Sequence, residues 1–367
     1  MKYLMFIVLI FSVLTAQFNW QENGVSLRQG AHIEWQRTGT VGENGEVILV
    51  WSDTRNGGRD VYAQKVDELG QNLWSEGGVP VVLTEGRQED PLAISDGAGG
   101  VYIVWKDYRY ESDNGDVFAQ HVLSDGSLDW TGEGVALSIV EGPQEFLNMC
   151  SDEIGGAFVI WIDRSTGSSI GGDVYATHLS LTGEIVDAGT GNAIITDGGD
   201  RGSISLETGG AGYANLVWSE VADTDWKVLM GQRLDLECET LWSEPEEGGK
   251  LLISSSSGDI KAPRVTHVGG DTAAIVWEDF RYNPVSPDVF LQFIDGDGNE
   301  LLNNGGIGIC IDSGKQSVPR VKANDNTAYV VWEDFRNHFL WGDVYGQAVS
   351  IDGTRSEEHT SELQSRT

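Results

Sequence analysis

A short acidic run has the residue types and spacing of a calcium loop. Asp295, Asp297 and Asn299 are separated by glycines, and side-chain oxygens at alternate positions begin an EF-hand loop. Such a loop needs a glutamate at its twelfth position, which here is Gly306. The run also aligns with ordinary hairpin turns elsewhere in the chain. We therefore treat the three residues as weak calcium candidates, favour a plain turn, and expect no other cofactor.

Carboxylates outside any repeating pattern are the next candidates for chemistry. Glu89, Asp90, Glu145 and Asp259 precede or open short apolar segments, and glycoside hydrolysis uses a pair of carboxylates. Among 57 acidic residues, however, close pairs arise by chance. The sequence has no HExxH zinc motif, nucleophile elbow, phosphate loop or CxxC pair. It therefore predicts no specific catalytic residue, and a non-catalytic protein is favoured over an enzyme.

An arginine and an aspartate recur together along the chain. Each arginine stands four residues after a tryptophan, and each aspartate opens the next apolar segment: Arg55 and Asp60, Arg109 and Asp116, Arg281 and Asp288, Arg336 and Asp343. The repeat around Trp218 lacks both residues. This joint loss predicts that they pair, because a guanidinium group fits a carboxylate bidentately. We expect structural clips, with a ring of ligand-binding sites as the alternative.

The tryptophans themselves define a repeat. They are Trp51, Trp105, Trp161, Trp218, Trp277 and Trp332, at intervals of 54, 56, 57, 59 and 55 residues. A fixed period of this size indicates a repeat architecture. Residues present in every repeat are therefore expected to build the scaffold, and a ligand site is expected among residues that the repeat does not explain.

One repeat predicts four short strands. In the sixth repeat, residues 318–322, 328–333 and 343–349 are rich in β-branched and aromatic residues and are separated by turn sequences. Earlier repeats add a fourth strand, such as residues 79–82. Four strands per unit without helical periodicity predict an all-β fold, a β-propeller of four-stranded blades. An open solenoid is the structural alternative.

The N-terminal region predicts how the propeller closes. Residues 19–25 match residues 73–79, a fourth strand, but no first three strands precede them. The sixth repeat has three strands and ends near Gly353. We therefore expect the N-terminal strand to complete the last blade, which removes open sheet edges. Six blades are visible, and seven or eight are expected if the natural chain continues.

Composition limits the partners. The net charge of −34 argues against nucleic acid and anionic membranes, which require clustered Lys and Arg. Residues 1–16 have the charged start, apolar run and small-residue end of a signal peptide, so export without later membrane insertion is expected. Cys150, Cys238 and Cys310 occupy different repeat positions and are expected to be unpaired. We expect a monomer.

The C-terminal end departs from the repeat. Residues 355–367 have no apolar periodicity and resemble the translation of a sequencing adapter. We therefore expect three segments: a signal peptide over 1–16, the propeller over 17–354, and a non-native tail over 355–367. On this interpretation the natural protein continues past Thr354.

The repeated phrases resemble those of a known group of proteins. Val-Trp-x-Asp-x-Arg, Asp-Val-Tyr-Ala-Gln and Gly-x-x-Leu-Trp are similar to repeats of uncharacterised exported bacterial propellers of TolB-like and sialidase-like type. That resemblance covers about residues 19–353 and implies a secreted or cell-surface location. Members often carry a type IX secretion sorting domain, and none is visible here.

Together these observations predict a secreted or cell-surface β-propeller that binds glycan or protein as a non-catalytic adhesion module. The alternative is a polysaccharide-acting propeller enzyme, a glycosidase or a lyase. Acids, His, Tyr or Arg outside the repeat pattern that converge at one mouth of the propeller would favour the enzyme.

Overall fold

The computed structural model describes residues 24–27, 34–111, 113–165, 172–196, 201–221, 226–242, 249–254, 258–324, 326–338 and 340–356. In these ranges the chain forms 23 strands and one 3-10 turn, η1 (Glu43–Gly45). The strands form six sheets, A to F in chain order.

The first three sheets have four strands each. Sheet A contains β1 (Glu34–Val41), β2 (Val47–Asp53), β3 (Asp60–Val66) and β4 (Val79–Val82). Sheet B contains β5 (Gln88–Ser95), β6 (Val101–Asp107), β7 (Asp116–Val122) and β8 (Val135–Ser138). Sheet C contains β9 (Gln144–Ser151), β10 (Ala157–Asp163), β11 (Asp173–Leu179) and β12 (Asn192–Ile195).

The last three sheets follow the same order, but sheet F has three strands. Sheet D contains β13 (Ser205–Thr208), β14 (Ala214–Val221), β15 (Lys227–Leu234) and β16 (Lys250–Ile253). Sheet E contains β17 (Ile260–Gly269), β18 (Thr272–Asp279), β19 (Asp288–Ile294) and β20 (Ile307–Cys310). Sheet F contains β21 (Gln316–Asn324), β22 (Thr327–Asp334) and β23 (Asp343–Ser350).

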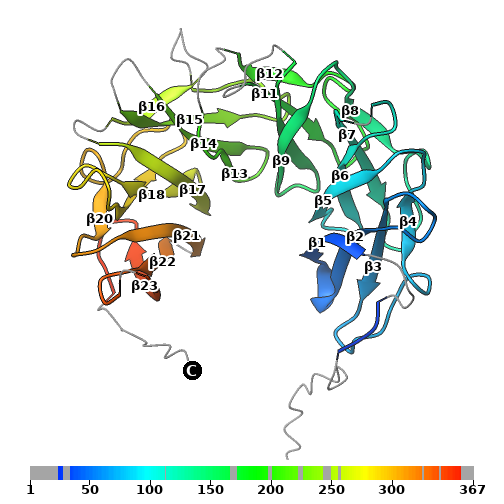
Figure 1. Cartoon of the computed structure of the whole chain (residues 1–367), viewed down its shortest axis with the longest axis horizontal. Coiled ribbons are helices and arrows are strands. Elements are labelled where there is room, and N and C mark those ends of the chain that lie inside the picture. The colour runs from blue at the N-terminus through cyan, green and yellow to red at the C-terminus, as the bar shows by residue number, and fades with distance from the viewer. Residues whose placement is uncertain are drawn as a thin grey trace, which may run out of the picture.

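The sheets stand side by side in an arc (Figure 1). Each is an antiparallel meander, and the first strand of each sheet contacts the first strand of the next, so β1, β5, β9, β13, β17 and β21 line the inside. Radial repetition of such meanders is the architecture of a β-propeller. The predicted all-β propeller of four-stranded blades is thus confirmed.

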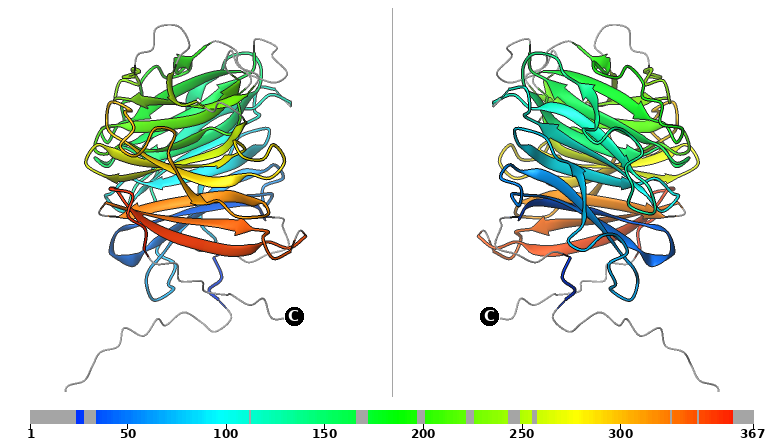
Figure 2. Two further views of the ribbon diagram at one scale, coloured as in Figure 1. Left: turned by 90° about the vertical axis from the view of Figure 1, so that its left-hand side faces the viewer. Right: turned by 90° about the vertical axis from the view of Figure 1, so that its right-hand side faces the viewer.

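The strands run between the two flat faces of the arc (Figure 2). Because neighbouring strands are antiparallel, loops between second and third strands emerge on the same face as the links between sheets. We call this the loop face; it includes residues 54–59, 108–115, 280–287 and 335–342 and the links 83–87, 139–143 and 311–315. The turns between first and second strands and between third and fourth strands emerge on the opposite face, which we call the turn face.

The core consists of layers between adjacent sheets. Ile48 and Val50 of sheet A pack with Ile103 and Trp105 of sheet B, while Tyr102 of sheet B packs against sheet C. The inner sheets are therefore covered on both sides. This explains why their second strands are nearly continuous apolar runs instead of alternating ones.

In sheets A to E, a glycine between the third and fourth strands makes room for the repeated tryptophan. At Gly306, φ is +76°, and a Cβ atom would lie 2.6 Å from Trp277. At Gly134, φ is also +76°, and a Cβ atom would lie 2.6 Å from Trp105. Only glycine combines this backbone conformation with such a close approach to an indole ring. The repeated glycine and tryptophan are thus parts of one packing unit.

The arc has two ends (Figure 1), and sheet F forms one of them. Sheet F exposes apolar side chains there. Tyr329 is 49% exposed and Val331 is 45% exposed, whereas their counterparts in sheet B, Tyr102 and Val104, are both 0% exposed. In sheet B these positions are covered by sheet C. The described residues provide no such cover for sheet F.

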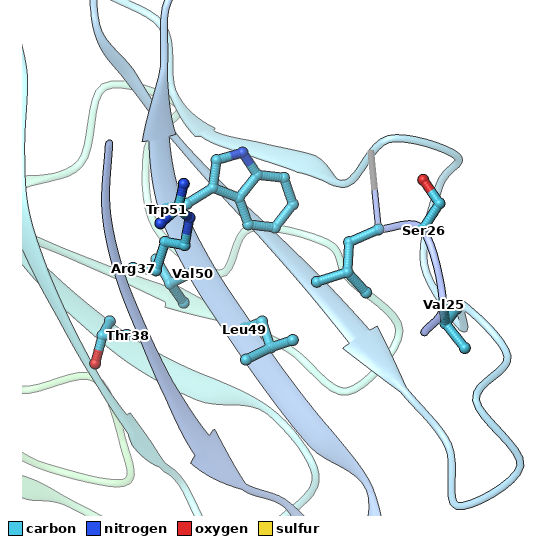
Figure 3. A pocket seen from close by; sticks show the side chains of 8 residues that line it. Val25, Ser26, Arg37, Thr38, Leu49, Val50 and Trp51 are labelled. Carbon is cyan, nitrogen blue, oxygen red and sulfur yellow. The ribbon is translucent and has the colours of Figure 1, made fainter. Parts of the chain in front are cut away.

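The predicted closing strand lies at the other end. Residues 19–23 fall outside the described residues, and Val25–Leu27 lie beside Trp51 of sheet A, around a cavity of about 310 Å³ (Figure 3). The Asn72 amide donates to the Ser26 carbonyl at 3.1 Å. Residues 25–27 thus lie beside sheet A as β4 lies beside sheet B. Among the described residues, sheet F has three strands. Closure of the last blade by residues 19–25 stays a prediction.

The three cysteines are free and buried, which confirms the prediction that they are unpaired. In the part of the chain that the structure describes, no helix is long and apolar enough to span a membrane. The expected signal peptide and residues 357–367 of the expected tail lie outside the described residues. Those two expectations stay predictions.

Candidate functional site

The recurring arginine forms a clip on the loop face, with a different partner from the predicted one. In sheet B, Asp107 Oδ2 accepts from Trp105 Nε1 at 2.8 Å and from Arg109 Nη2 at 2.6 Å. Arg109 also donates to the Glu133 carbonyl at 2.8 Å, and its guanidinium carbon lies 4.0 Å from the centre of the Phe118 ring. One arginine thus joins the second strand, the third strand and the loop before the fourth.

The pairing of this arginine with the aspartate that opens the third strand was predicted wrongly. In sheets A, E and F the arginine binds the aspartate two residues before it: Arg55 binds Asp53, Arg281 binds Asp279 and Arg336 binds Asp334. The same carboxylate also accepts a hydrogen bond from the indole of the repeated tryptophan. Among the described residues, no hydrogen bond or ion pair joins these arginines to Asp60, Asp288 or Asp343, nor Arg109 to Asp116. The two aspartates face each other across the strand pair, as Asp107 faces Asp116, so spacing alone could not distinguish them.

Repeats three and four vary the clip. Arg164, which stands one place early, pairs with Glu145 at 2.8 Å. In sheet D, Trp218 Nε1 donates to Glu220 at 2.7 Å, and Arg201 from the preceding link lies 3.7 Å from the same carboxylate. The repeat of sheet D has no arginine four residues after its tryptophan, and Arg201, which is more distant in sequence, lies near Glu220 in its place.

The acids proposed from sequence lie where first strands begin, and each has a cationic neighbour. Glu89 pairs with Arg59 and with Arg87, and Asp90 lies 3.5 Å from Lys106. Asp259 pairs with Lys261 at 2.8 Å. Burial opposes ionisation of Asp259, but hydrogen bonds from Lys261 and the Lys227 backbone lower its pKa overall. These carboxylates form ion pairs instead of an acid and base pair.

The calcium candidates form a plain hairpin turn. Asp295 Oδ1 accepts from the backbone N–H of Asp297 at 3.0 Å and of Asn299 at 2.8 Å. The Lys250 ammonium donates to the Asp297 carbonyl at 2.7 Å and to Asn299 Oδ1 at 3.2 Å. A cationic side chain thus already contacts these oxygens. Among the described residues, no cluster of three or more His, Cys, Asp or Glu could hold a metal.

The residue that follows the clip arginine comes in two kinds. In sheet F, Asn337 Nδ2 donates to Asp343 Oδ2 at 3.1 Å and to the Tyr345 hydroxyl at 3.4 Å. In sheet A, Asn56 donates to the hydroxyl of Tyr62 in the same way. In these two sheets an amide therefore connects the loop to the polar groups of the third strand.

Sheets B and E replace this amide by an exposed aromatic ring. Tyr110 and Tyr282 are 67% and 65% exposed. Their rings lie 6.4 Å and 6.2 Å from those of Phe118 and Phe290, the third-strand residues that replace the tyrosines of sheets A and F. The two changes occur together: where the asparagine is replaced by tyrosine, the third-strand tyrosine whose hydroxyl the asparagine would bind is replaced by phenylalanine.

Two buried aspartates lie beside the exposed tyrosines. Asp116 and Asp288 are 8% and 5% exposed, and neither accepts a side-chain hydrogen bond from the residues that the structure describes. In sheet A, which keeps the asparagine, Asp60 Oδ2 is also a buried oxygen without a partner among those residues. Burial, together with the charge of Asp107, raises the pKa of Asp116 to about 6. Burial and the charge of Asp279 raise the pKa of Asp288 to about 6. A buried acceptor without a donor is costly unless a ligand supplies one.

Asp288 lines a pocket at the loop face between sheets E and F. Its volume is about 340 Å³, and its walls are the loop after β18 and the link after β20: Tyr282, Asn283, Ser286, Asp288, Ile311, Asp312, Ser313 and Gly314. We call it the Tyr282 pocket. Asp312 is held by Arg336 at 3.0 Å. The pocket thus combines an exposed ring, hydroxyls, an amide and carboxylate acceptors.

No sequence-predicted catalytic or metal residue lines the Tyr282 pocket. Asp288 was predicted as a clip residue, and Tyr282 was missed. The missed signal was the joint change from Asn and Tyr in two repeats to Tyr and Phe in two others, which was visible in the sequence.

No family model and no curated protein sequence matches this chain. Three solved structures resemble its fold at low identity. An α-L-arabinanase of Penicillium chrysogenum complexed with arabinobiose has 13% identity, a TM-score of 0.48, and coverage of 89% of this chain and 97% of its own. The polysaccharide lyase Uly1 has 11% identity, a TM-score of 0.47, and coverage of 85% of this chain and 76% of its own. A fucose-specific lectin of Aleuria aurantia has 13% identity, a TM-score of 0.41, and coverage of 88% of this chain and 93% of its own. The TolB-like and type IX expectations stay predictions.

Proposed function

We propose that the protein is a glycan-binding propeller that holds a neutral saccharide in the Tyr282 pocket. The proposal rests on one observation: Asp288 is a buried carboxylate without a donor, and it lines a pocket beside an exposed tyrosine ring. A saccharide offers both matching features. Its hydroxyls donate to carboxylates, and its apolar ring face packs on an aromatic side chain.

Charge favours a neutral ligand over an anionic one. The protein has a net charge of −34, and the pocket includes two carboxylates, Asp288 and Asp312. An anionic sugar would be repelled by both the local and the overall field. The expected export of the chain agrees with an extracellular glycan and remains part of the proposal.

Binding should depend on the ionisation of Asp288. The ionised carboxylate only accepts hydrogen bonds, whereas the protonated form must also place a donor. Since the pKa of Asp288 is raised to about 6 by burial and by Asp279, affinity should be full above pH 7 and should weaken as pH falls through about 6. Asp288→Asn should remove this pH dependence.

The test is a glycan array on the full chain, followed by calorimetry on the neutral glycans that bind. Tyr282→Ala and Asp288→Asn should each raise Kd by about tenfold or more, the loss expected when a central contact is truncated. Asn337→Ala, at the same repeat position of sheet F, is the matched control and should leave Kd unchanged. Unaltered affinity in both pocket variants would refute the proposal.

A second candidate function is cleavage of a polysaccharide at the same pocket. The raised pKa of Asp288, to about 6, is typical of a glycosidase general acid. Asp312, paired with Arg336, is the other carboxylate of the pocket. Product release from polysaccharides, lost in Asp288→Asn, would establish the enzyme. Binding without any product would favour the lectin-like function.

A further inference from the structure

We infer that sheet B carries a second saccharide site, built on Tyr110 and Asp116, so that one chain binds glycan at two places on its loop face. This inference rests on the saccharide site proposed for sheet E. It extends that proposal from one pocket to a bivalent protein.

Sheets B and E carry matching residues at matching positions. Tyr110 follows the clip arginine as Tyr282 does, and the two are 67% and 65% exposed. Asp116 opens the third strand as Asp288 does and pairs in register with Asp107 of the second strand, as Asp288 pairs with Asp279. Chemistry and position are therefore the same in both sheets.

The surroundings also match. The Arg109 guanidinium carbon lies 4.0 Å from the centre of the Phe118 ring, and that of Arg281 lies 4.2 Å from the centre of the Phe290 ring, so both loops are held alike. Ile139, the first residue after β8, is 51% exposed; Ile311, at the same position after β20, is 55% exposed and lines the Tyr282 pocket. An exposed ring, a buried acceptor and an apolar side chain thus recur together.

The other described sheets supply the contrast. In sheets A and F an asparagine donates to the polar groups of the third strand. In sheet C the carboxylate of Asp163 accepts from the backbone N–H of Ser165 at 2.7 Å, and Arg164 pairs with Glu145 instead. In sheet D, Val228 stands at the aspartate position. Asp60 Oδ2 of sheet A is also a buried oxygen without a partner among the described residues, but that sheet has an asparagine in place of the tyrosine. The exposed tyrosine beside a buried aspartate is therefore what sheets B and E share.

The placement of these sheets decides what kind of ligand suits the protein. Sheets B and E lie on opposite sides of the arc (Figure 1), and both sites are on loops between second and third strands, hence on the loop face. Two sites on one face can engage a surface or polymer that repeats the same sugar. The second binding event is then intramolecular, which raises avidity without new contacts.

The experiment follows both tyrosines separately. The full chain is labelled with 3-fluorotyrosine, and the fluorine resonances of Tyr110 and Tyr282 are assigned with Tyr110→Phe and Tyr282→Phe. The labelled protein is titrated with the methyl glycosides of glucose, galactose, mannose and arabinose. We expect one glycoside to shift both resonances with similar dissociation constants. Asp116→Asn should abolish the shift of Tyr110 and leave that of Tyr282.

Each outcome decides a different claim. A shift of Tyr282 alone would overturn the second site and leave the proposed function intact. A shift of Tyr110 alone would overturn the equivalence of the sites and the assignment of the proposed function to Tyr282. Lack of any shift would overturn both. Circular dichroism of the Asp116→Asn variant shows whether a lost shift reflects lost folding, and binding at Tyr282 serves as an internal control.

Bivalency has its own readout. On a surface densely coated with the active glycoside, the full chain should dissociate at least about tenfold more slowly than Tyr110→Ala, because avidity commonly reaches that size. On a sparse surface the two should dissociate at similar rates. Equal rates on both surfaces would contradict bivalent engagement while leaving the single sites unaffected.

Discussion

At the residue scale, one arginine in each of sheets A, B, E and F binds a buried carboxylate. Asp107 is 0% exposed and receives both the Trp105 indole and the Arg109 guanidinium. Without the arginine, this buried carboxylate would retain the Trp105 indole and a long hydrogen bond of 3.4 Å from Gln88 Nε2, and no cationic donor. The clip therefore acts mainly by compensating a buried charge, and its loss should affect the loop and the second strand together.

Replacement of Arg109 tests the clip. Arg109→Met should lower the free energy of unfolding by about 2–4 kcal/mol, because it leaves the buried Asp107 charge poorly compensated. Denaturant titration gives the value. Arg87→Met is the control: Arg87 pairs with Glu89 but is 38% exposed at its side chain, so its loss should cost less than about 1 kcal/mol. Equal small losses in both variants would contradict a structural clip.

The sequence predicted the arginine of each clip and a carboxylate partner for it, but it predicted the wrong aspartate. Two aspartates lie within reach of each arginine, and only the backbone decides which is bound. Tyr282 was missed for a different reason: its function depends on a pocket formed with the link after β20, and one repeat considered alone does not reveal that neighbour.

At the element scale, a cation on the third strand holds the hairpin turns of the turn face. His121 on β7 contacts Asp96 Oδ2 at 2.9 Å and Asp129 Oδ2 at 3.0 Å, and it stacks on Tyr102 at 4.3 Å. In sheet A the same position holds Lys65, which pairs with a glutamate of the first hairpin. These cations connect strands that are not adjacent in the sheet.

The pH dependence of stability should report this histidine. Burial lowers the pKa of His121, but the hydrogen bonds that its ring donates to Asp96 and Asp129 raise it above 6.5 overall. Its contribution is therefore fully present below pH 6.5 and is lost as pH rises through the folded-state value. His121→Gln should cost about 1–3 kcal/mol at pH 6 and less at pH 9. The exposed His338→Gln is the control, and a loss that does not vary with pH would contradict the ion pairs.

The element pattern itself was predictable because each strand is a short run of β-branched and aromatic residues between turns. The four-strand unit followed from that pattern, and the structure confirms it. The position of residues 25–27 was only half predictable. They lie beside sheet A but form no strand in the structure. Which sheet they would complete depends on the curvature of the whole arc, and no single repeat carries that information.

At the scale of the whole molecule, the end of the arc at sheet F differs from the interior. Val331 is 45% exposed, while Val104 at the same repeat position of sheet B is 0% exposed. Val331→Lys should change the free energy of unfolding by less than about 0.5 kcal/mol, as expected for an exposed site. Val104→Lys should cost more than about 4 kcal/mol or prevent folding, because it buries an unpaired charge.

Thermal unfolding of the two variants measures this difference. If Val331→Lys also destabilises strongly, the side of sheet F is covered in solution, by closure of the ring or by another chain. If both variants are tolerated, the two-sided burial of the inner sheets is wrong. The pair thus tests the open arrangement without reference to any ligand.

The open arc also determines where unfolding can begin. Each inner sheet has two neighbours, but sheets A and F, at the ends, each have one sheet neighbour among the described residues. In such a row, stability is approximately a sum of sheet and interface contributions. An end sheet can detach by breaking one interface, whereas an inner sheet must break two. Amide hydrogens of β22 should therefore exchange with solvent through local fraying, and those of β10 and β14 mainly through global unfolding.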